Sequence, residues 1–365
     1  MVRHNLVRMM QLKLTLLKIP ALRYQSSASF RSDIQVHRTV PDLRAYRNQF
    51  SRSSQSVGLV PTMGALHEGH LSLVRLAAAQ NPAVFVSIYV NPTQFGVTED
   101  LSTYPATWDS DMKKLEAVDR ELASTPGSGR VVAVFAPTTE VMYPSGFPSQ
   151  EIGGSGSFVT ISPLGSVLEG ASRPVFFRGV ATVCMKLFNI VKAERVYFGQ
   201  KDVQQTVVIQ RMVKDFHVDT NVIIGDTQRE VDGLALSSRN IYLGSRRRSV
   251  AVVLSQALMK AEEQFLKGKR TRDELLGPAW ELLKERHAGQ DTLPSEQRAR
   301  FEADYISLAD PESLEEIDAV DDRGAILSGA IKMMPLEDPV SGEDAGMGGG
   351  IGTVRLIDNI ILRPT

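Results

Sequence analysis

The sequence predicts an α/β fold in which helices cover a parallel sheet, followed by a smaller α+β domain. Two continuous apolar runs, 83–90 and 131–137, have the length and composition of strands that are buried on both faces, as in a parallel sheet. Segments with helical spacing of apolar residues, such as 71–79 and 180–191, alternate with such runs. Beyond residue 243 the pattern changes to helices and then three half-buried strands, which predicts a second domain.

Composition limits the classes of function. The 365 residues are 42% hydrophobic and 23% charged, as in ordinary globular proteins, and carry a net charge of -1. This charge gives no electrostatic argument for binding nucleic acid or an anionic membrane, and no apolar run is long enough to span a bilayer. We therefore expect neither partner. The single cysteine, Cys184, excludes an internal disulfide and lies in an apolar helical pattern typical of a core residue.

Residues 1–32 differ from the rest of the chain. They contain no Asp or Glu, several Arg and Lys residues, and a serine cluster at 26–29. This composition predicts a mitochondrial transit peptide. The alternative is a disordered basic extension on a cytoplasmic protein. The folded part is expected to start near Ile34, with a short strand and a helix up to Phe50.

A glycine-bearing turn over residues 61–70 joins the apolar run 57–60 to a helix that we expect to begin near His70. A helix that starts after such a turn presents backbone N–H groups and a positive dipole end, which favour phosphate. His67 and His70 are three residues apart and can share one face, where imidazoles could donate to nucleotide phosphates. The alternative is two surface histidines near a turn.

Polar residues follow the strand predicted at 83–90. In open α/β sheets ligands bind beyond the carboxyl ends of strands, so Asn91 and Gln94 lie where a substrate is expected. Hydrogen bonding within a loop would place the same residue types there. Asp111 lies early in a helix predicted over 107–122, where the helix dipole favours a carboxylate.

Two later segments also carry candidate phosphate ligands. Lys201 follows a strand that ends at Gly199, and its ammonium can reach phosphate. Asp202 can accept from ribose hydroxyls, although capping of the next helix is the default role. The segment 237–239 offers two hydroxyls and a guanidinium that can surround a triphosphate. A polar loop before a helix is the alternative.

Together these segments resemble the pantoate–β-alanine ligase (pantothenate synthetase) family of His-x-Gly-His nucleotidyltransferases. The resemblance covers about residues 34–365 and rests on five blocks: Pro61–His70, Asn91–Gly96, Leu168–Pro174, Gly199–Asp202 and Asp232–Asn240. It implies a Rossmann-like nucleotidyltransferase domain over residues 33–227. A C-terminal lid domain over residues 228–365 is expected to cover the ATP site.

The resemblance also implies a reaction and a set of site residues. Pantoate and ATP would give pantoyl adenylate and pyrophosphate, and β-alanine would then give pantothenate and AMP, with Mg²⁺ as cofactor and a homodimer as the assembly. The implied catalytic residues are His67, His70, Lys201, Ser237, Ser238 and Arg239. Further ATP-binding residues are Pro61, Thr62, Met63, Gly64, Gly69, Gly199, Asp202, Gln228 and Leu236. The implied substrate-binding residues are Asn91, Gln94, Arg173 and Gln205, and Asp111 is the metal candidate.

The chain departs from the family at a few positions. Gln200 replaces a glutamate, and Ser110 and Lys114 stand where family members can carry Asp and Gln, which bears on the metal site. One alternative function is that of another nucleotidyltransferase, such as a cytidylyltransferase, which would explain the histidines but not the pair Gln94 and Gln205. Another is a nucleotide-binding module without catalysis, although all the phosphate-facing residues are retained.

Overall fold

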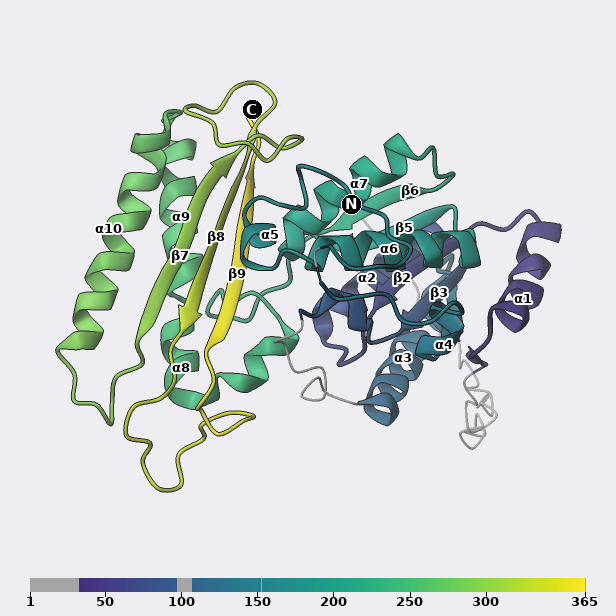
Figure 1. Cartoon of the computed structure of the whole chain (residues 1–365), viewed down its shortest axis with the longest axis horizontal. Coiled ribbons are helices and arrows are strands. Elements are labelled where there is room, and N and C mark those ends of the chain that lie inside the picture. The colour runs from purple at the N-terminus through teal and green to yellow at the C-terminus, as the bar shows by residue number, and fades with distance from the viewer. Residues whose placement is uncertain (1–32, 97–106, 152, 365) are drawn as a thin grey trace, which may run out of the picture. The chain divides into compact units, whose positions relative to one another are not determined.

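The computed structural model describes residues 33–96, 107–151 and 153–364, which contain a six-stranded parallel sheet and a three-stranded antiparallel sheet (Figure 1). Predictions for residues 1–32, including the transit peptide, lie outside the described residues. The strands of the parallel sheet are β1 Gln35–His37, β2 Val57–Thr62, β3 Ala83–Ile88, β4 Arg130–Phe135, β5 Arg195–Gly199 and β6 Asn221–Gly225. The predicted α/β fold is confirmed.

The strand order indicates where on the parallel sheet a ligand site is expected. The order is β1-β4-β3-β2-β5-β6, and all neighbouring pairs are parallel. From β2 the chain adds β3 on one side, whereas β5 and β6 lie on the other side. The order therefore reverses between β2 and β5, and ligands bind at the carboxyl ends of strands at such a point. The histidine turn follows β2, and Lys201 follows β5.

Helices cover both faces of this sheet because its strands are apolar on both sides. The longer helices are α1 Val40–Arg52, α2 Glu68–Gln80, α3 Trp108–Ala123, α6 Phe176–Val191 and α7 Val203–Asp215, and the short ones are α4 Thr139–Met142 and α5 Glu169–Ser172. Helices α2 and α3 share a buried cluster with Val60 and Val84, whereas α1, α6 and α7 share another with Leu59 and Phe85. Successive residues of one strand thus pack into the hydrophobic cores on opposite faces of the sheet.

The second sheet has its own core. Its strands are β7 Phe301–Ala309, β8 Ala325–Met333 and β9 Val354–Leu362, all antiparallel, and its helices are α8 Gly244–Ala251, α9 Val253–Leu266 and α10 Arg272–Asp291. The apolar spacing over 249–266 predicts one amphipathic helix, but the structure divides this stretch at Val252. The predicted lid boundary at residue 228 stays a prediction, since β9 also contacts the turn after β5. No helix in the described ranges has the length and apolarity needed to cross a membrane.

The acidic, glycine-rich segment 337–352, which the sequence predicts to be a mobile surface loop, packs against the start of α8. Glu343 pairs with Arg246, and both side chains are largely buried. The N–H of Met347 donates to the carbonyl of Ile241 at 2.9 Å. These contacts hold the segment beside the residues that follow Arg239.

Candidate active site

A cavity of about 1050 Å³ is lined by residues from both sheets. It collects most of the residues that the sequence singled out, which come from segments far apart in the chain. The predicted residues that line it are Pro61, Thr62, Met63, His67, Gly69, His70, Gln94, Arg173, Gly199, Lys201, Asp202, Gln205, Gln228, Leu236, Ser237, Ser238 and Arg239. Gly64, Asn91 and Asp111 are not among the lining residues.

The turn between β2 and α2 lines the cavity. Helix α2 starts at Glu68, two residues before the predicted start, and His67 is its N-cap. Gly64 and Ala65 adopt positive φ angles of 85° and 50°, which cost a non-glycine residue conformational energy. Gly64 therefore shapes the backbone of the turn rather than lining the cavity.

Asp111 of α3 holds this turn from behind. Its side-chain carboxylate accepts the N–H groups of Ala65 at 2.9 Å and Leu66 at 2.8 Å, and the hydroxyl of Thr107 at 2.9 Å. The residue is 1% exposed. The structure thus gives Asp111 a different role from the predicted magnesium ligand, because its oxygens are occupied by the turn. Within the described ranges, no group of three or more His, Cys, Asp and Glu residues is arranged to hold a metal ion.

The two histidines line the cavity, and each uses its Nδ1 atom to accept a backbone N–H. Nδ1 of His67 accepts the N–H of Gly69 at 3.2 Å, and Nδ1 of His70 accepts the N–H of His67 at 3.4 Å. A neutral imidazole that accepts at Nδ1 carries its hydrogen on Nε2. Burial, and then the charge of Lys201, lowers the pKa of His67 to about 4. Burial, and then neighbouring His67, lowers the pKa of His70 to about 3. Both are therefore neutral N–H donors near pH 7.

Lys201 and Asp202 lie in a single helical turn, Gln200–Asp202, between β5 and α7. The Lys201 ammonium is 3.6 Å from the Asp202 carboxylate. The default expectation that the Asp202 side chain caps α7 is wrong, because this side chain makes no capping hydrogen bond. Its carboxylate stays at the cavity, where hydroxyl groups can donate to it.

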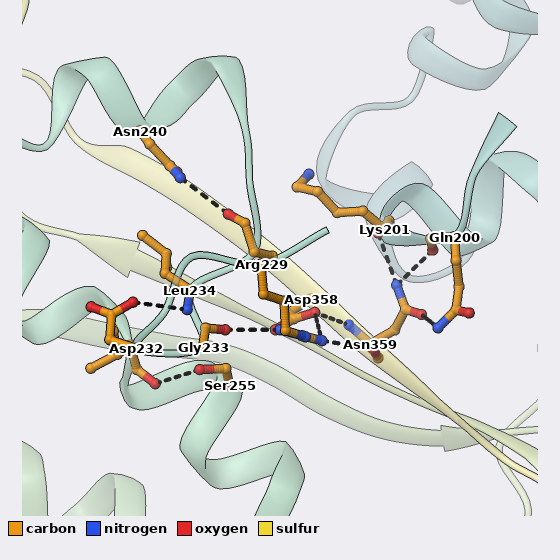
Figure 2. Close-up of polar contacts among 12 residues, drawn as sticks. Gln200, Lys201, Arg229, Asp232, Gly233, Leu234, Asn240, Ser255, Asp358 and Asn359 are labelled. Carbon is orange, nitrogen blue, oxygen red and sulfur yellow. Dashed lines mark hydrogen bonds and ion pairs between the residues drawn. The ribbon is translucent and has the colours of Figure 1, made fainter. Parts of the chain in front are cut away.

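Residues 237–239 reach the cavity from the segment that leads to the second sheet. The N–H of Leu236 donates to the carbonyl of Gln228 at 2.9 Å. The Asn240 side chain, labelled in Figure 2, donates to the carbonyl of Ala235 at 3.1 Å. Oγ of Ser237 accepts the N–H of Arg239 at 3.2 Å. The loop is thus held on both sides of its two hydroxyls and its guanidinium.

Asn91 was predicted to bind substrate, but it does not line the cavity. It is 1% exposed, and its amide donates to Oε1 of Gln94 at 2.9 Å and to the carbonyl of Gly179 at 3.2 Å. Its oxygen accepts the hydroxyl of Tyr143 at 2.7 Å. Asn91 therefore orients Gln94, whose oxygen is occupied and whose NH₂ group remains as the donor.

Gln204 and Gln205, in the first turn of α7, both border the cavity, but Gln204 is buried. The Gln204 amide donates to the carbonyls of Leu164 at 2.8 Å and Val167 at 2.7 Å. One glutamine thus fixes the loop before α5, and the next faces the ligand space. Gln94 and Gln205 lie in the same cavity, as the substrate assignment requires.

Comparisons with known proteins agree with this geometry. The sequence model described as Pantoate-beta-alanine ligase matches residues 35–361. A pantothenate synthetase from Roseiflexus castenholzii is 44% identical over 329 residues, covering 90% of this chain and 99% of that protein. The chain belongs to the pantoate–β-alanine ligase family.

Solved structures support the same membership. A pantothenate synthetase crystal structure from Thermus thermophilus has a TM-score of 0.71 and 36% identity, covering 91% of this chain and 100% of that chain. A pantoate-beta-alanine ligase from Francisella tularensis, complexed with "Beta-gamma ATP and Beta-alanine", has a TM-score of 0.60 and 29% identity, covering 90% and 97%. This chain therefore shares the fold of structurally characterised ligases of the family.

Three cavity residues of this ligase-family chain form a contact between helix α5 and the second sheet that was not predicted. The Glu169 carboxylate accepts the hydroxyl of Tyr305 at 3.0 Å and pairs with the Arg355 guanidinium. Burial, and then the nearby Glu169 charge, raises the pKa of the Tyr305 hydroxyl, which therefore stays a donor. Arg355 also pairs with Asp304 at 2.7 Å. The alternating pattern of β7 and β9 signals a half-buried polar face, but not the segment that this face meets.

Proposed function

We propose that this protein condenses pantoate with β-alanine at the expense of ATP, releasing AMP and pyrophosphate. The observation that carries the proposal is that one cavity joins the histidine turn, Lys201 and residues 237–239 to the two glutamines, Gln94 and Gln205. The first group offers donors and cations for a triphosphate. The glutamines offer amide groups to a hydroxy acid.

The first step is an attack of the pantoate carboxylate on the α-phosphorus of ATP. A new P–O bond forms, the bond to the β-phosphate oxygen breaks, and pyrophosphate leaves with the electron pair. Negative charge grows on the phosphate oxygens, and the Nε2–H groups of His67 and His70 and the ammonium of Lys201 stabilise it as fixed donors. The site otherwise acts by holding the carboxylate and the phosphorus in line.

The second step uses the acyl adenylate formed in the first. The neutral amine of β-alanine attacks the acyl carbon, the bond to the adenylate oxygen breaks, and AMP leaves while the nitrogen loses a proton. No covalent bond to the protein is required, and Cys184 is buried, with the pKa of its thiol raised by that burial to about 12. Arg173, at the cavity wall over the Phe176 ring, is our candidate for the carboxylate of a substrate.

We propose that magnesium enters as part of the nucleotide substrate, bound by phosphate oxygens and water. Asp111, the residue expected to hold it, is engaged by the backbone of the turn. Mg²⁺ commonly keeps several waters and binds through substrate phosphates, so a full set of protein ligands is not needed.

The order of product release tests this function. We expect ATP and pantoate alone to release one equivalent of pyrophosphate per site, and AMP to appear in multiple turnovers only after β-alanine is added. A nucleotide-binding module without catalysis would bind ATP and release no pyrophosphate. A cytidylyltransferase would prefer CTP and ignore pantoate. Either result would reject the proposal.

We also propose a homodimer and a mitochondrial location. The first follows from the family resemblance, and sedimentation of the purified chain at twice the mass of 40.1 kDa would support it. The second is supported by the acid-free, basic composition of residues 1–32. A reporter fused to these residues should enter mitochondria, and an evenly cytosolic reporter would favour the cytoplasmic alternative.

A further inference from the structure

Asn359 of β9 is bonded to the turn that carries Lys201 (Figure 2). Its side-chain NH₂ donates to the carbonyls of Gln200 and Lys201, each at 2.9 Å. Its oxygen accepts from Nε2 of Gln200 at 3.2 Å. Asn359 is 1% exposed, and it borders the cavity beside Lys201. Its NH₂ group provides hydrogen-bond donors for the carbonyls of Gln200 and Lys201, which lie where the chain leaves β5 and enters α7.

The preceding residue, Asp358, is bonded to the other phosphate-facing loop. Its carboxylate accepts hydrogen bonds from both terminal nitrogens of Arg229, at 2.5 and 2.9 Å (Figure 2). Arg229 also donates to the carbonyl of Gly233 at 3.1 Å. A bidentate pair of this kind fixes orientation as well as distance. It therefore holds the base of the loop that carries residues 237–239.

We propose that Asp358 and Asn359 are positioning residues that fix Lys201 relative to residues 237–239. We call the pair the β9 clamp. The proposal rests on the proposed function, because it takes these two loops to be the triphosphate ligands. Catalytic donors must be held within about 0.5 Å of their productive positions, and a displacement of about 1 Å can cost about a hundredfold in rate. Because β9 is hydrogen-bonded to the turn of Lys201 and to the base of the loop with residues 237–239, it restricts the distance between them.

The chemistry of Asn359 suits this role. A planar amide supplies two N–H donors to two carbonyls and also accepts one bond. An aspartate has nearly the same volume, but its charged oxygens would face the carbonyls of Gln200 and Lys201 and repel them. Asn359→Asp therefore changes the hydrogen bonding with little change in packing. Asn189, exposed on α6, allows the same chemical change away from the site and is the matched control.

The experiment measures steady-state pyrophosphate release from ATP, pantoate and β-alanine in four full-length enzymes: wild type, Asn359→Asp, Lys201→Ala and the double variant. We expect Asn359→Asp to lower kcat at least about tenfold, as loss of a positioned geometry does, while the Kd for pantoate stays unchanged. In the Lys201→Ala background the same change should cost less than about threefold, because the group it positions is gone. Asn189→Asp should match the wild type.

Two results would overturn the clamp. One is a folded Asn359→Asp enzyme with kcat within about twofold of the wild type. The other is a double variant in which the two losses multiply, which would show that Asn359 acts independently of Lys201. If Asn359→Asp does not fold, Asn359→Ser, which retains one donor, takes its place in the same cycle. If the wild type itself releases no pyrophosphate, the proposed function fails, and the Kd for ATP in the same four proteins still tests the clamp.

Discussion

The substitution Asp111→Asn separates a structural role at the turn from a role in metal binding. In the structure, the carboxylate accepts two backbone N–H groups and one hydroxyl while being 1% exposed. Asparagine has nearly the same volume, but one of its two terminal groups is a donor. Either Ala65 or Leu66 would then present its N–H to an NH₂ group.

The size of the effect follows from these bonds. A hydrogen bond to a charged group contributes about 1.5–3 kcal/mol, and a buried donor left without an acceptor costs a similar amount. The substituted side chain would keep one acceptor, so we expect a loss of about 3 kcal/mol in the free energy of unfolding. Gly64 and Ala65, held at positive φ, should also relax, which would raise the KM for ATP.

Denaturant unfolding and a magnesium titration of pyrophosphate release provide the two measurements. We expect lower stability with an unchanged half-saturating magnesium concentration. Asp109→Asn, on the exposed face of the same helix, is the matched control and should change neither quantity. A variant with wild-type stability and a raised magnesium requirement would refute the reasoning and restore Asp111 as a metal ligand.

Further predictions concern the histidines, Lys201 and Gln94. Since the folded pKa values of His67 and His70, about 4 and 3, lie below the ordinary 6.5, the unfolded chain binds more protons below pH 6.5. Stability should therefore fall as pH drops from 6.5 to 4, and His67→Gln should flatten this slope in urea titrations. Lys201→Ala and His70→Ala should each cost about 3 kcal/mol of transition-state stabilisation, and near-normal rates in folded variants would contradict the site. Gln94→Ala should weaken pantoate but not ATP in calorimetry, so equal loss of both would reject its assignment.

Local patterns predicted much of the fold. The continuous apolar run at 83–90 predicted β3, and the turn at 61–70, singled out from the sequence, contributes residues to the cavity wall. The start of α2 was misplaced because His67 is not among the usual N-cap residues. The break at Val252 has no glycine or proline to signal it.

The site was harder to predict where a role depends on distant packing. Asn91 and Gln94 both follow β3, and the sequence cannot show that Asn91 turns toward Gly179 and Tyr143 while Gln94 faces the cavity. Asp111 has a position suited to the helix dipole, but the N–H groups it meets belong to a segment more than 40 residues earlier. Hydrophobic periodicity identifies a buried face and carries no information on such polar partners.

The contact of β9 with the turn after β5 has a consequence for biosynthesis of the chain. Residues 354–362 leave the ribosome after both loops that Asp358 and Asn359 hold. The parallel sheet and its helices can therefore form while the bonds to Lys201 and Arg229 are still missing. If the proposed function holds, we expect a nascent chain that has not reached β9 to contain the histidine turn while Lys201 and residues 237–239 are not yet fixed relative to each other, and so to turn over ATP slowly.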